Sequence, residues 1–154
     1  MADNYLRLRF SDDGDGTGEL LARAEADGFA GESGAYFNPA EIEAFAKAIG
    51  TFPLPVDDKR LSIAGGFWSR ERRGDLEQEL LGISVYFADA PRGYIGIQVR
   101  MATPIWKGTR PDSKKSAAVE VVTTYEPLAK FSRDLDAVLR GKLKEAVLKG
   151  QSLL

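Results

Sequence analysis

The chain has 154 residues, 44% of them hydrophobic, and a net charge of −2, which is typical of one globular domain that needs no disulfide or metal support. It contains no cysteine and no histidine, so Ser-His-Asp and Cys-His nucleophilic centres, thiolate metal sites and the usual general base near neutral pH are excluded. The charge is uneven, because residues 1–58 hold 4 Lys/Arg against 12 Asp/Glu (net −8) and residues 59–154 hold 17 against 11 (net +6). This division predicts a dipolar surface that could orient a charged partner.

The amino-terminal residues lack the basic head and apolar core of a secretory signal peptide, and no stretch approaches the ~20 apolar residues of a membrane span. No nucleotide or cofactor motif has the required spacing. We therefore expect a cytoplasmic protein of bacterial type, without a cofactor and without a membrane partner.

Alternating apolar and polar residues predict two half-buried strands near the amino terminus, at residues 5–10 and 20–26. The segment between them, Ser-Asp-Asp-Gly-Asp-Gly-Thr-Gly-Glu, has the composition of a calcium loop that would start at Asp13. The twelfth position of such a loop is Ala24, where a bidentate glutamate is required, and its flanks are strands instead of helices. We interpret the segment as a hairpin turn that binds no metal and presents an acidic surface, formed by Asp12, Asp13, Asp15 and Glu19.

A third short strand is predicted at residues 35–37, directly before a helix. Asn38 followed by Pro39 and Glu41 is typical of a helix start, because Asn caps the first turn and Pro suits its first position. Apolar residues then recur at helical spacing up to Gly50, where we expect the helix to end.

The second half of the chain predicts four further strands, at residues 59–68, around 81–87, at 95–101 and around 117–124. Matching the apolar faces of the middle two strands sets Phe87 opposite Ile95 and Tyr86 opposite Gly96. A last helix begins near Pro127, and Gly141 either ends it or kinks it. Because the strands come in runs, we expect one α+β domain over residues 1–154, a mainly antiparallel sheet of about seven strands with both helices on one face.

Carboxylates are the remaining route to catalysis, and Glu77 and Glu79 lie two residues apart in the fifth strand. In simple alternation they share the face of Leu81 and Ile83, where burial would raise one carboxylate pKa as acid–base catalysis requires. Alternatively, a bulge near Leu81 reverses the register and leaves both glutamates in water.

If the last four strands form a meander, the polar loops 69–75 and 107–115 emerge at the same end of the sheet. That end would gather a binding surface of aromatic and basic residues, namely Trp68, Arg70, Arg72, Arg73, Trp106, Lys107, Arg110, Lys114 and Lys115. Five acidic residues share the region, so nucleic-acid binding is not favoured, and a surface for a protein or an anionic ligand competes with a plain solvated rim. Gln98 and Arg100 make the opposite sheet face polar, as a wet surface or as the floor of a shallow site.

The stretch Gly-Ala-Tyr-Phe-Asn at 34–38, followed by Glu-Ile-Glu-Ala-Phe at 41–45, resembles small uncharacterised bacterial proteins near the WapI-like immunity proteins of polymorphic toxin systems. The resemblance implies an amino-terminal hairpin, a helix, further strands and a last helix. It also implies binding and neutralisation of a toxin domain without catalysis, and it transfers no individual site residue.

We therefore predict a non-catalytic protein-binding module, in a narrower interpretation an immunity-type protein whose acidic half covers a basic partner. Two alternatives remain open. One is a small enzyme that uses Glu77 and Glu79 with Tyr86 or Arg100. The other is a ligand-binding or structural homodimer joined through a strand edge or the final helix.

Overall fold

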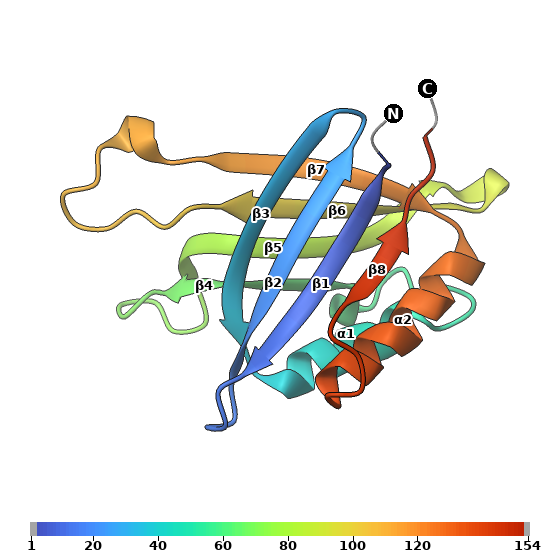
Figure 1. Ribbon diagram of the computed structural model, residues 1–154, viewed down its shortest axis with the longest axis horizontal. Coiled ribbons are helices and arrows are strands. Elements are labelled where there is room, and N and C mark those ends of the chain that lie inside the picture. The colour runs from blue at the N-terminus through green and yellow to red at the C-terminus, as the bar shows by residue number, and fades with distance from the viewer. Residues whose placement is uncertain (1–2, 153–154) are drawn as a thin grey trace.

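The computed structural model describes residues 3–152 and shows an α+β protein with two four-stranded antiparallel sheets and two α-helices (Figure 1). The first sheet has the strand order β3-β2-β1-β8, and the second has the order β4-β5-β6-β7. The strands are β1 (Tyr5–Asp12), β2 (Gly18–Ala26), β3 (Phe29–Phe37), β4 (Ser62–Trp68), β5 (Leu76–Asp89), β6 (Tyr94–Ala102), β7 (Ser116–Thr123) and β8 (Ala146–Lys149). The helices are α1 (Pro39–Ile49) and α2 (Tyr125–Leu139).

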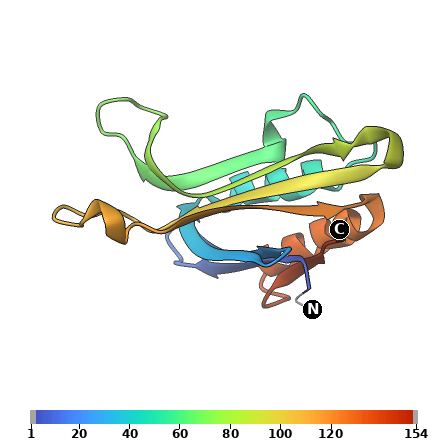
Figure 2. The same cartoon turned by 90° about the horizontal axis from the view of Figure 1, so that it is seen from above.

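The α+β class and the antiparallel pairing are confirmed, but the strands form two sheets and number eight in the described residues, where one sheet of about seven was expected. The reason lies in the connections, because α1 carries the chain from the first sheet to the second and α2 carries it back. The alternation of apolar and polar residues within a strand indicates which face is buried. It does not indicate which sheet the strand joins. The two helices lie beside the sheets, at the end away from the long loops of the second sheet (Figures 1 and 2).

The two sheets pack face to face as separate layers, and β3 runs across all four strands of the second sheet (Figures 1 and 2). Gly31 near the start of β3 lies against β6 and β7, and the Ser33 hydroxyl donates to the Leu80 carbonyl of β5 at 2.6 Å. Farther along, Phe37 packs against Gly65 of β4. Such steep crossing is the orthogonal mode of sheet packing.

The crossing explains why β3 is longer than the three residues expected from the sequence. The sequence predicts a strand only at residues 35–37, yet β3 begins at Phe29, and Gly31 lets it approach the second sheet closely. A Cβ at Gly31 would lie 2.9 Å from Cε of Met101 and 3.0 Å from Cβ of Ala117. The glycine inside the strand therefore makes room for side chains of the second sheet.

The first helix is built as the sequence predicts. The Asn38 side chain accepts a hydrogen bond from the backbone N–H of Ala40 at 2.9 Å, and Gly50 follows the last helical residue. A side chain at Gly50 would strike Ser132 of α2, whose hydroxyl donates to the Ala46 carbonyl at 2.6 Å. Gly50 therefore ends α1 and also allows the two helices to touch.

The second helix ends at Leu139, and Gly141 adopts a left-handed φ of 74°, so the glycine terminates the helix and does not kink it. The chain then forms β8, which pairs with β1 and buries Ala146 and Leu148. The sequence pattern does not reveal β8, because two inward residues are too few for alternation to be recognised. Among residues 3–152, no helix is both long and apolar enough to cross a membrane.

The pairing of β5 with β6 has the predicted register. Phe87 lies opposite Ile95 and Tyr86 lies opposite Gly96. The same register places Arg100 opposite Gly82, on the face of the second sheet that points away from the first. That outer face carries the polar side chains, while the inner face joins the hydrophobic core.

Candidate binding groove along β3

The acidic segment forms the turn between β1 and β2, as the sequence predicts. A carboxylate oxygen of Asp12 accepts from the backbone N–H of Gly14 at 2.7 Å, and Asp15 accepts from the N–H and the hydroxyl of Thr17 at 3.0 and 2.7 Å. The hydroxyl bond, followed by the backbone bond, lowers the pKa of Asp15. Over residues 3–152, no three acidic side chains are grouped in a way that could hold a metal ion.

The predicted pair Glu77 and Glu79 lies in the first half of β5, where a β-bulge interrupts the pairing with β4. Between Gly65 and Gly66 the register jumps by two residues of β5, which leaves Leu80 as the extra residue. Both glutamates are exposed, so the structure has the second of the two orientations that the sequence left open.

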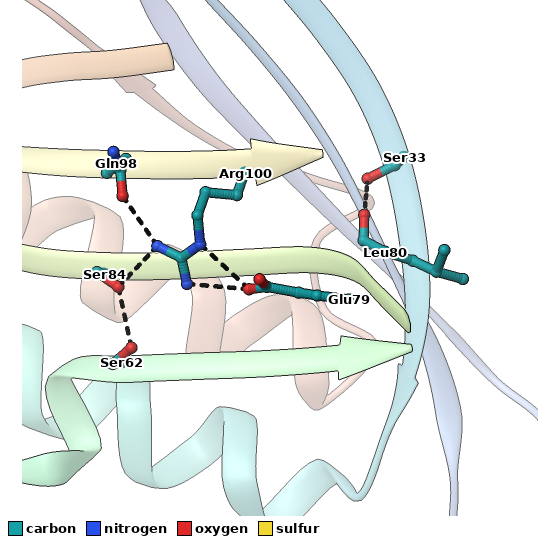
Figure 3. Close-up of polar contacts among 7 residues, drawn as sticks. All are labelled: Ser33, Ser62, Glu79, Leu80, Ser84, Gln98 and Arg100. Carbon is teal, nitrogen blue, oxygen red and sulfur yellow. Dashed lines mark hydrogen bonds and ion pairs between the residues drawn. The ribbon is translucent and has the colours of Figure 1, made fainter. Parts of the chain in front are cut away.

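Glu79 belongs to a hydrogen-bonded network on the outer face of the second sheet (Figure 3). Nε and Nη2 of Arg100 donate to Oε1 of Glu79 at 3.1 and 3.0 Å. Nη1 of the same guanidinium donates to the Ser84 hydroxyl at 3.1 Å and to Oε1 of Gln98 at 3.0 Å. The Ser62 and Ser84 hydroxyls are 2.9 Å apart. Glu79 is therefore partnered by the Arg100 cation.

Tyr86, suggested as a residue that acts with these glutamates, is engaged elsewhere on the same face. Its hydroxyl donates to the Glu120 carboxylate on β7. Burial of the ring, followed by this hydrogen bond, raises the pKa of Tyr86 well above its ordinary value. Gly96 makes room for the ring, because a Cβ there would lie 2.6 Å from Cε2 of Tyr86.

The loops after β4 and β6 emerge at the same end of the second sheet, as the meander predicts, and project past β3 (Figure 1). The residues expected to form one surface there are divided between several places. Trp68 is 51% exposed and lines a hollow with Arg70, Arg72 and Glu77, whereas Trp106 lines a second hollow that adjoins the first at Phe67. Other predicted residues are exposed on the loops, namely Arg73, Lys107, Arg110, Lys114 and Lys115.

The groove that contains Trp106 has a volume of about 410 Å³ and runs between β3 and the loop end of the second sheet. One wall is β3 from Glu32 to Tyr36, and the other includes Phe67, Trp106 and residues 102–104. A hollow of about 220 Å³ borders the adjoining residues 30–32 of β3 and shares Glu32, Ala102 and Thr103 with the groove. We call this combined feature the β3 groove.

The aromatic wall of the β3 groove is held in place by contacts between loop and sheet. The rings of Phe67 and Trp106 lie 5.0 Å apart between centroids. The Gln78 side chain donates to the Ile105 carbonyl at 2.9 Å and accepts from the Ile105 N–H at 2.8 Å, which fixes the backbone next to Trp106. Trp106 is nonetheless 62% exposed, so most of its ring is open to solvent.

The backbone of β3 is open along this groove. The two-residue turn between β2 and β3 has positive φ at Asp27 and Gly28 and is closed by the pair Ala26–Phe29. In a hairpin of this kind the closing pair is hydrogen bonded and the bonds alternate from there. The N–H and C=O groups that point away from β2 therefore belong to Ala30, Glu32, Gly34 and Tyr36. Within the described residues, none of these groups bonds to another part of the backbone.

The end of the groove at Tyr36 is negatively charged. Asp13 and, next, Glu19 raise the pKa of Tyr36, with smaller contributions from partial burial and from Asp15. The tyrosine is 55% exposed, so the negative charges of the hairpin act on an aromatic ring that a partner can reach from solvent. The acidic surface and the aromatic wall are thus parts of one site.

Sequence reasoning identified Trp106 and the acidic residues but missed Tyr36, Phe67 and the free edge of β3. The alternation at residues 35–37 does place Tyr36 on the opposite face from its neighbours, which is a usable signal for exposure. The crossing of the two sheets joins these residues into one site, and no local pattern reports it. No family model, no curated protein and no solved structure matches this chain.

Proposed function

We propose that the protein is a non-catalytic protein-binding module and that the β3 groove is its binding site. The observation that carries the proposal is the exposure of Trp106 and Tyr36 on the two sides of an open groove. Large aromatic side chains in a concave site are the residues that most often dominate the energy of protein interfaces. A folded chain gains nothing for its own stability from leaving them in water.

The charge at the groove favours a basic protein partner. Asp13, Asp15 and Glu19 lie at the Tyr36 end, whereas Glu32 in the groove wall is already ion-paired with Arg7 and Arg23 of its own sheet. The carboxylates at the Tyr36 end attract Lys and Arg side chains and repel the phosphates of nucleic acids.

The outer face of the second sheet supports a non-catalytic role. Its arginine, glutamate and tyrosine groups are bonded to one another, as Glu79 is to Arg100 and Tyr86 is to Glu120. These bonds give each group a structural partner on the sheet.

The experiment presents the purified protein with a phage-displayed library of random peptides about ten residues long, which is long enough to cover residues 30–36 at ~3.3 Å per residue. Selected peptides should contain basic and apolar residues. A synthetic copy should bind Trp106→Ala about tenfold or more weakly and Trp68→Ala within about twofold of the unaltered protein. The matched control is Trp68, because it is similarly exposed but lines a different hollow.

The proposal is wrong if the library yields no binding peptide. It is also wrong if both tryptophan variants bind the selected peptide alike.

The narrower form of the proposal is an immunity-type role, in which the basic partner is a toxin domain. The acidic hairpin beside the groove supports it, because many toxic nucleases need a basic surface to bind nucleic acid. If a toxin domain is encoded next to this gene, co-expression of the two should restore growth, and Trp106→Ala should abolish the protection. Unchanged toxicity with the unaltered protein would overturn the immunity role.

A further inference from the structure

We propose that the β3 groove receives an extended segment of a partner protein as an added β-strand, paired with the free edge of β3 and carrying basic side chains at its Tyr36 end. This proposal rests on the binding function proposed above and specifies how the partner is held. Strand addition of this kind draws affinity from backbone hydrogen bonds and specificity from pockets for alternate side chains.

Among the sheet edges of the described chain, β3 is the one suited to accept a strand. It pairs with β2 over nine residues without a register shift. By contrast, β4 has two register shifts, β8 has four residues, and β7 is partly occupied where the Gln151 N–H donates to the Val122 carbonyl at 2.8 Å. Short, irregular or covered edges resist pairing, and β3 has none of these protections along the groove.

The second sheet supplies a floor for the added strand. A strand paired with β3 would lie ~4.8 Å from it, above the loop end that projects past β3 (Figure 1). Ser33 lies on the inward face of β3 and Tyr36 on its outward face, and both line the groove. Because residues of both faces line it, the groove lies along the edge of the strand. Alternate side chains of the added segment would therefore face Phe67 and Trp106, and we expect them to be apolar.

Charge complementarity sets the remaining chemistry. The outward side chains of the added segment would lie beside Glu32 and Tyr36, on the face where the acidic hairpin ends. Lys or Arg at the position beside Tyr36 would meet Asp13 and Glu19. Lys115 lines the opposite end of the groove, so a basic residue is disfavoured there.

The first test alters one backbone group of β3. Glu32→Pro removes an N–H that points away from β2, so the β2–β3 ladder keeps its hydrogen bonds. Glu32→Gln is the matched control, because both variants lose the ion pairs of Glu32 with Arg7 (3.7 Å) and Arg23 (3.6 Å) while Gln keeps the N–H. We expect the selected synthetic peptide to bind the proline variant about tenfold or more weakly than the glutamine variant.

The second test leaves the protein unaltered and holds even if the proline variant fails to fold. Single N-methyl groups are placed along the selected peptide, one residue at a time. An added strand predicts an alternating pattern, in which methylation weakens binding at every second residue, where the N–H faces β3. Equal losses at successive residues, or no losses, would overturn the proposal.

The outcomes separate this proposal from the function on which it rests. If Glu32→Pro and the methylated peptides bind like their controls while Trp106→Ala still binds weakly, the groove is the site and strand addition is wrong. If Trp106→Ala binds normally as well, the proposed function is also wrong. The free chain could also dimerise, and Glu32→Pro could abolish the dimer. That result would identify a second copy of the chain as the occupant of the groove and would overturn the proposal of a separate partner protein.

Discussion

At the scale of single residues, Tyr36 reports the charge of the acidic hairpin. Negative groups nearby disfavour the phenolate, so the pKa of Tyr36 is raised. Replacing Asp13 by Asn and Glu19 by Gln should lower this pKa toward the ordinary value. Absorbance titration of the two-site variant and the parent, each compared with its Tyr36→Phe counterpart, isolates this tyrosine from the other four. An unchanged pKa would show that the hairpin does not act on the groove.

Affinity should depend on the same charges. Raising the salt concentration from ~0.05 to ~0.5 M shortens the screening length severalfold, so binding of a basic peptide should weaken. The triple variant Asp13→Asn, Asp15→Asn, Glu19→Gln should bind the peptide more weakly at low salt. Its affinity should also lose most of its dependence on salt. Titration calorimetry at the two salt concentrations checks this, and equal salt dependence in variant and parent would contradict it.

At the scale of elements, the hydrogen bond from Ser33 to the Leu80 carbonyl ties β3 to the bulge of β5. Ser33→Ala leaves that partly buried carbonyl without its partner and should lower the free energy of unfolding by about 1 kcal/mol. Ser62→Ala removes an exposed hydroxyl contact and should change it by less than about 0.5 kcal/mol. Urea denaturation measures both, and equal effects would mean that the contact between β3 and the bulge is unimportant.

The bulge itself depends on Gly66. A Cβ there would lie 2.0 Å from the carbonyl oxygen of Gln78, which is backbone and cannot swing away. Gly66→Ala should therefore cost about 2–3 kcal/mol of stability. At Gly82 the nearest atoms are the side-chain ends of Glu79 and Arg100, which can move, so Gly82→Ala should cost about 1 kcal/mol or less. Thermal or urea unfolding of the pair distinguishes the two situations, and the reverse order would contradict this account of the bulge.

Sequence reasoning succeeded for elements whose signal is local. The cap at Asn38 and the register of β5 against β6 follow from hydrogen-bonding capacity and from matched apolar faces. It did not find β8, and it predicted the strand β3 only at residues 35–37, without its glycine-containing start. Both misses concern contacts between segments far apart in the chain, where Gly31 meets Met101 and where β8 pairs with β1. The residues of the candidate site could be predicted only in part for the same reason. The acidic residues belong to the first sheet and the wall of Phe67 and Trp106 to the second, and only the crossing of the sheets brings them together.

At the scale of the whole molecule, the crossing of the two sheets leaves the regular edge of β3 beside Phe67 and Trp106. Glu19 of the first sheet lines the groove at its Tyr36 end, and Lys115, directly before β7, lines the opposite end. A groove with opposite charges at its two ends favours one direction of an extended segment that binds in it.

The most direct measurement of the central claim is residue-resolved amide hydrogen exchange, by nuclear magnetic resonance, with and without the selected peptide. If the groove binds the peptide along β3, exchange should slow at Glu32, Gly34 and Tyr36, whose N–H groups point into the groove. The amides of β8, a distant edge of the same sheet, should be unchanged. Protection that appears elsewhere while these three amides exchange at their original rates would contradict the account.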